Sequence, residues 1–136
     1  MKINKKGLAH IPVILILIWL LSSQAMAQSD VINNVRASLK TGSSKELVKS
    51  FNTTVELNFD GKKSTYSRTQ AEFVLKDFFK KYPPTDFQYI HQGSSKQGLT
   101  YVIGKYTYDT GSFRVLLYLK NFSGQYKVDL IDFSKE

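Results

Sequence analysis

The chain has 136 residues and no cysteine, which excludes disulfide bonds, thiolate metal ligands and a cysteine nucleophile. Its 19 Lys and Arg residues outnumber 11 Asp and Glu residues, and a net charge of +8 favours anionic partners. The length suits one small domain with a single core.

The first 27 residues have the pattern of a signal peptide. Three lysines precede an apolar run over residues 11–21, and Ala25-Met26-Ala27 matches the motif that signal peptidase reads. The alternative is a retained anchor, but the run is shorter than the roughly 20 apolar residues of a membrane span. We therefore expect an exported protein, periplasmic or secreted, without a membrane anchor after cleavage and with residues 28–136 as one domain. Cleavage removes the three lysines, which lowers the net charge from +8 to +5. Among anionic partners, nucleic acid is not expected for an exported protein.

Two helices are predicted at the start of the exported part. Apolar residues three or four positions apart indicate a helix over residues 30–40, with Ser29 or Asp30 as its N-cap. A short helix that ends at Ser50 follows, with Ser43 or Ser44 as its N-cap. The side chains expected to face the core are Val31, Ile32, Val35, Leu39, Leu47, Val48 and Phe51.

A hairpin and a longer helix come next. Alternating apolar residues predict a strand over residues 55–59, and the Asp-Gly pair at 60–61 is typical of a tight hairpin turn. The Ser-x-x-Gln segment at 67–70 predicts a capping box, and the prolines at 83–84 end the helix. The apolar face of this helix comprises Ala71, Val74, Leu75, Phe78, Phe79 and Tyr82.

Four strands joined by turns are predicted after the prolines. The strands cover residues 87–92, 99–108, 112–120 and 125–133, and a polar loop at 93–98 joins the first two. Helices followed by such a meander indicate an α+β fold, with the helices on one face of a bent antiparallel sheet.

The third of these strands has apolar side chains on both faces. Phe113 and its alternating neighbours are expected to face the helices, which leaves Leu116 and Tyr118 on the outer face of the sheet. A weak homodimer through that face would cover them. The alternative is a monomer with scattered apolar atoms on its surface.

The candidate ligand-binding residues are Tyr89, His91, Tyr101 and Arg114. Alternation places Tyr89 and His91 on one strand face, where both would look into the fold. The structural alternative packs Tyr89 in the core and leaves His91 at the sheet margin. Arg114 either binds a carboxylate or phosphate or pairs across the sheet with Asp129 or Asp132.

No metal site and no cofactor are expected. His91 is the one histidine after residue 27, and a lone histidine without a carboxylate nearby in sequence is rarely a metal ligand. The lysine pairs at 62–63 and 80–81 are expected to be solvated.

Several short segments occur in an order that resembles a known family. They are Phe51-Asn52, Val55-Glu56-Leu57, Tyr66-Ser67, Gln70-Ala71, Leu75-Lys76-Asp77-Phe78-Phe79, Pro83-Pro84, His91-Gln92-Gly93-Ser94-Ser95 and Gly111-Ser112-Phe113-Arg114-Val115. The chain resembles small exported Bacteroidota proteins that carry a domain of unknown function, within the nuclear transport factor 2-like, or cystatin-like, superfamily. That resemblance implies a cone of three helices against a strongly curved antiparallel sheet.

The resemblance supplies no established activity. The superfamily includes isomerases, dehydratases, polyketide cyclases and many non-catalytic binders, so its fold does not identify a function. The sequence favours a non-catalytic exported module that binds a small ligand or a partner protein. The alternative is a small isomerase or dehydratase with a pocket inside the cone, in which His91 is the base and Tyr89 or Tyr101 the proton donor.

Overall fold

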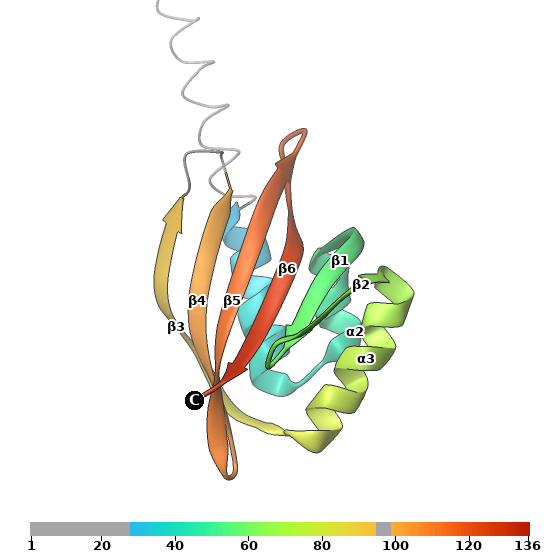
Figure 1. The fold of residues 1–136 in the computed structure, drawn as a ribbon. Helices are drawn as coiled ribbons and strands as arrows, with labels where there is room; N and C mark the ends of the chain where they lie inside the picture. Colours follow the sequence, from blue (N-terminus) through green and yellow to red (C-terminus); the bar gives the residue numbers. More distant parts are fainter. Residues whose placement is uncertain (1–27, 95–98) are drawn as a thin grey trace, which may run out of the picture.

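The structure, a computed structural model, describes residues 28–94 and 99–136 (Figure 1). The predicted signal peptide and residues 95–98 of the predicted loop lie outside the described residues. Across the described part, no helix has the length and apolar character that a membrane span requires.

The two predicted N-terminal helices are confirmed. The first occupies residues 28–41, and the second comprises α2 (Ser44–Leu47) and the 3-10 turn η1 (Val48–Ser50). The predicted N-cap of the first helix is wrong, because Ser29 and Asp30 are themselves helical. Ser43 caps α2, since its Oγ accepts a hydrogen bond of 3.2 Å from the backbone N–H of Glu46.

The hairpin and the long helix also follow the prediction. Strands β1 (Phe51–Phe59) and β2 (Lys62–Ser67) are joined by an Asp-Gly turn with φ of 53° and 91°. Helix α3 (Arg68–Lys81) begins with the predicted capping box. Ser67 Oγ accepts from the Gln70 N–H at 3.2 Å, and Gln70 Oε1 accepts from the Ser67 N–H at 3.0 Å.

The meander consists of β3 (Pro84–Ser94), β4 (Thr100–Tyr108), β5 (Gly111–Phe122) and β6 (Gln125–Lys135). All six strands form one sheet in the order β2-β1-β6-β5-β4-β3. The predicted α+β class is confirmed, although the pair β1–β6 is parallel rather than antiparallel. The predicted loop begins too early, because β3 continues through Ser94.

The described helices lie against one face of the curved sheet (Figure 1). As predicted, Phe113 is buried on that face, whereas Arg114 is exposed and Leu116 and Tyr118 are only partly buried. Large side chains pack the described interior of the cone. Its largest buried members are Tyr106, Phe51, Phe87, Phe133, Leu39, Leu47, Leu57, Leu75, Leu117 and Leu119.

Candidate functional site

Tyr89 points into the fold, where it connects the sheet to the first helix. Its hydroxyl donates a 2.7 Å hydrogen bond to the Ile32 carbonyl, and the Arg36 guanidinium lies 5.0 Å from its ring centre. Burial raises the pKa of Tyr89, and the nearby Arg36 only partly offsets this effect. The phenol therefore stays protonated at neutral pH and has a structural partner already.

His91 lies on the opposite face of the sheet from Tyr89, so the prediction that they share a face is wrong. Tyr89 pairs with Gly104, whereas His91 pairs with Ile103, because the register shifts between the two β3 residues. Ile90 is the extra residue of this bulge, and it interrupts the period of two. A single bulge thus separates two residues that the sequence pattern had placed together.

His91 and Tyr101 do come together, on the outer face of the sheet. His91 Nε2 and the Tyr101 hydroxyl are 3.3 Å apart, and their ring centres are 5.7 Å apart. A Cβ at Gly93 would lie 2.4 Å from the Tyr101 hydroxyl, so a glycine there lets the ring lie against β3. His91 is exposed rather than enclosed in a cavity.

Arg114 lies on the same outer face, opposite Lys105 on β4 and Ser134 on β6. Among the described residues it forms no ion pair, either with Asp129 or with Asp132. The predicted ion pair of Arg114 with one of these aspartates is therefore not formed among the described residues.

The described interior offers few groups for acid–base chemistry. Its buried polar side chains are Ser38, Ser50 and Thr100, and every described carboxylate is at least partly exposed. The Tyr106 hydroxyl donates to the Tyr82 carbonyl, and burial raises the pKa of Tyr106. No group of three or more His, Asp or Glu residues in the described part could hold a metal ion.

A groove of about 400 Å³ lies between the C-terminal half of α3, the β1–β2 hairpin, the start of β5 and the end of β6. We call it the α3 groove. Its apolar lining comprises Phe59, Val74, Phe78, Tyr82 and Phe113, and its charged lining comprises Lys62, Lys81, Lys135, Asp60 and Asp77.

The lysines of the α3 groove are not neutralised by ion pairs. The ammonium groups of Lys81 and Lys135 each lie 5.5 Å from the centre of the Tyr82 ring. Within the described residues, neither they nor Lys62 has a carboxylate within ion-pair distance. Asp60 instead accepts a hydrogen bond of 3.2 Å from the backbone N–H of Lys135.

Sequence reasoning missed this groove. Its three lysines lie far apart in the chain, and two of them belong to the lysine pairs expected to be solvated. They meet because β6 ends beside the β1–β2 hairpin, a consequence of the parallel β1–β6 pair.

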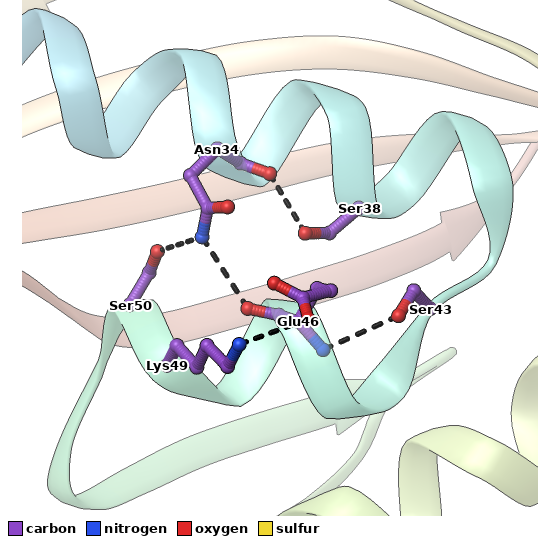
Figure 2. A network of polar contacts seen from close by, with 6 residues as sticks. All are labelled: Asn34, Ser38, Ser43, Glu46, Lys49 and Ser50. Atoms are coloured by element: carbon purple, nitrogen blue, oxygen red, sulfur yellow. Dashed lines mark hydrogen bonds and ion pairs between the residues drawn. The ribbon is translucent and has the colours of Figure 1, made fainter.

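A second groove, of about 450 Å³, lies where the first helix, η1 and the start of β6 meet. Figure 2 shows that Asn34, Lys49 and Ser50 of its lining belong to one network of polar contacts. Asn34 Nδ2 donates to Ser50 Oγ at 2.6 Å and to the Glu46 carbonyl at 3.3 Å, and Lys49 pairs with Glu46 at 2.9 Å. This network fixes the first helix to α2 and η1, so we assign it a structural role.

The model of the domain of unknown function DUF4783 matches residues 32–134. A DUF4783 family protein from Bacteroides ovatus ATCC 8483 is 32% identical with a TM-score of 0.71, and the match covers 76% of this chain and 93% of that chain. The corresponding protein from Bacteroides uniformis ATCC 8492 is 27% identical with a TM-score of 0.71, over 76% of this chain and 95% of that one.

More distant structures share only the fold. A protein of unknown function with a cystatin-like fold from Nostoc punctiforme is 8% identical, with a TM-score of 0.63 over 82% of this chain and 90% of that chain. No curated protein matches the sequence.

Proposed function

The chain belongs to the DUF4783 family, a domain of unknown function with a nuclear transport factor 2-like fold, and from this premise we propose that it is an exported, non-catalytic binding module. Its ligand is a small monoanion that carries an apolar group. The ligand binds in the α3 groove.

The observation that carries this proposal is the combination of unpaired ammonium groups and aromatic surface in one groove. Lys81 and Lys135 lie against the same ring, that of Tyr82, without a neutralising carboxylate. Each ammonium group lies 5.5 Å from the centre of that ring, so an anion bound beside the ring is attracted by both positive charges. Each ammonium group also supplies hydrogen-bond donors for a carboxylate.

The rest of the lining defines the ligand further. Phe59, Val74 and Tyr82 are only partly buried, so they offer apolar surface to a bound group. Asp60 and Asp77 reduce the positive charge of the groove and disfavour a polyanion. Three lysines against two carboxylates therefore suit a single negative charge.

The placement of the described acid and base groups favours binding over catalysis. The enzyme alternative needs a base inside an enclosed pocket, but His91 is exposed on the outer face, and Tyr89 donates to the Ile32 carbonyl. The α3 groove contains no histidine, and its two aspartates are exposed to solvent.

Calorimetric titration of the secreted, processed chain tests this function. Phenylacetate and the uncharged phenylacetamide have similar shapes, so they differ chiefly in the charge that the lysines recognise. We expect phenylacetate to bind with a Kd of about 1 mM or lower and phenylacetamide to bind at least about tenfold more weakly. Equal binding of both compounds, or of neither, contradicts the proposal.

Two variants and a matched control locate the site. Lys81→Gln and Lys135→Gln should each weaken phenylacetate binding about tenfold, because a hydrogen bond to a charged group is lost. Lys80→Gln should leave binding unchanged, since Lys80 lies in the same last turn of α3 but does not line the groove. If all three variants weaken binding equally, the effect comes from net charge alone.

A further inference from the structure

One side of β2 is an unpaired sheet edge in the described structure. β2 is the first strand in the order β2-β1-β6-β5-β4-β3, and its register pairs it with β1 alone. Beyond that pair, residues 62–66 make no backbone–backbone hydrogen bond with a described residue. Every second residue of an antiparallel strand directs its N–H and C=O away from the neighbouring strand. β2 therefore offers main-chain donors and acceptors along its outer edge.

This edge leads to the α3 groove. Lys62 is both the first residue of β2 and part of the groove lining. Helix α3 follows β2 directly and contacts it, and the C-terminal half of α3 lines the groove together with Lys62. An extended segment that pairs with the outer edge of β2 can therefore continue into the groove.

The side chains of β2 make its edge selective. Residues 62–65 are exposed, and lysine on an edge strand discourages pairing with strands of other chains. Lys63 pairs with Glu56, whereas Lys62 has no ion pair with a described residue. A segment that brings a carboxylate offsets the charge of Lys62. The edge is thus closed to most strands but suits an anionic one.

The end of a polypeptide combines the required features. Its last residue has one carboxylate and one side chain, which are the two features of the ligand proposed for the groove. Lys81 and Lys135, both beside the Tyr82 ring, suit the carboxylate, and the partly buried Phe59 and Val74 suit an apolar side chain. The preceding residues supply main-chain groups at the spacing of a β-strand. A small free acid would leave the edge of β2 unused.

From this juxtaposition we propose that the α3 groove binds the carboxyl-terminal segment of another protein, whose last residue is apolar. The segment adds to β2 as a further strand, and its last side chain enters the groove. It runs antiparallel to β2, because its end lies beside Lys62, where β2 begins. This inference rests on the proposed function, since it assigns a ligand class to the same groove. Main-chain hydrogen bonds supply affinity, and the lysines select the free carboxylate.

Calorimetric titration of the secreted, processed chain with three acetylated probes is the first test. The probes are N-acetylphenylalanine, a peptide of four alternating serines and threonines that ends in phenylalanine, and the same peptide with a terminal amide. We expect the peptide acid to bind at least about tenfold more tightly than either of the other two. Lys81→Gln should remove most of the preference for acid over amide, whereas Lys80→Gln should preserve it.

The outcomes separate this inference from the proposed function. Equal affinity for the peptide acid and N-acetylphenylalanine overturns the inference but leaves the proposed function intact, because the groove then recognises the small acid alone. Equal affinity for the peptide acid and its amide also overturns the inference, since the carboxyl terminus is then not recognised. If neither phenylacetate nor any of the three probes binds, both proposals are wrong.

N-methylation of the peptide tests the addition of a strand. Successive N–H groups of a strand point to opposite sides, so methylation of one of two adjacent amides should weaken binding about tenfold and methylation of the other should have little effect. Hydrogen exchange provides a second readout on the protein. The peptide acid should protect alternate amides within residues 62–66, whereas N-acetylphenylalanine should not. If both methylated peptides bind as tightly as the unmodified one and exchange is unchanged, the segment does not pair with β2 and the inference is overturned.

Discussion

The hydroxyl of Tyr106, which is fully buried on β4, donates a hydrogen bond to the backbone carbonyl of Tyr82 at the end of α3. The same residue, Tyr82, presents its ring to the α3 groove, with Lys81 and Lys135 beside it. The Tyr106 hydroxyl therefore fixes the backbone of Tyr82, whose ring lines the α3 groove.

Tyr106→Phe should destabilise the fold by about 1–3 kcal/mol, because the Tyr82 carbonyl loses its hydrogen-bond donor. Unfolding in urea measures this change. Tyr108→Phe is the matched control, since the Tyr108 hydroxyl makes no hydrogen bond with the described residues, and it should cost little. If both variants lose the same free energy of unfolding, the hydrogen bond from Tyr106 to the Tyr82 carbonyl does not stabilise the fold.

Phe78→Ala should destabilise the protein by about 3–5 kcal/mol, because it leaves a cavity in the aromatic core. The ring centre of Phe78 lies 4.4 Å from that of Phe133 and 5.2 Å from that of Phe59. Thermal unfolding followed by circular dichroism gives the measurement. Phe73→Ala, on the exposed face of the same helix, should change the free energy of unfolding only slightly. An unchanged melting temperature in Phe78→Ala would contradict the packing described above.

Stability should fall at alkaline pH. Burial raises the pKa of Tyr89 and of Tyr106 above their ordinary value of 10.0, so both phenols hold their protons more tightly in the folded state. The unfolded chain releases these protons first, and the stabilisation is complete below about pH 10 and lost as the pH rises further. Urea unfolding from pH 8 to about pH 11 follows this loss.

A double variant provides the control for the alkaline effect. Tyr89→Phe combined with Tyr106→Phe should be less stable at neutral pH and should show a shallower decline above about pH 10. A decline as steep as that of the wild type would assign the effect to other groups.

Export should produce a chain that begins at Gln28, because Ala25-Met26-Ala27 matches the signal peptidase motif. Mass spectrometry of protein from the periplasm or medium identifies the N-terminus. Ala27→Asp should block cleavage and retain the precursor, whereas Ser29→Asp, just beyond the site, serves as the control. Membrane-bound protein that keeps residues 1–27, with no processed chain in the periplasm or medium, would show that the segment is an anchor rather than a signal peptide.

The elements that could be predicted from the sequence are those whose signals are local. The capping box at Ser67 and Gln70, the Asp-Gly turn and the apolar face that includes Phe78 and Phe79 each depend on residues within one or two turns of chain. The inward direction of Phe113 followed from simple alternation on an uninterrupted stretch of β5.

The features that could not be predicted depend on distant residues or on irregular backbone. The parallel pair β1–β6 joins strands that no turn connects, and it brings Lys135 beside the hairpin that carries Lys62. The bulge at Ile90 moves His91 to the outer face, and no glycine or proline at that position signals it. For these two reasons, the α3 groove differs from the binding site that the sequence predicted.

The central claim is that the α3 groove binds a small monoanion with an apolar group. The most direct measurement follows the side-chain ammonium resonances of the lysines by nuclear magnetic resonance while phenylacetate is added. We predict saturable shifts for Lys62, Lys81 and Lys135, together with the Tyr82 ring, and constant resonances for Lys80 and Lys105. Shifts that spread evenly over all lysines, or that leave the groove lysines unchanged, would contradict the claim.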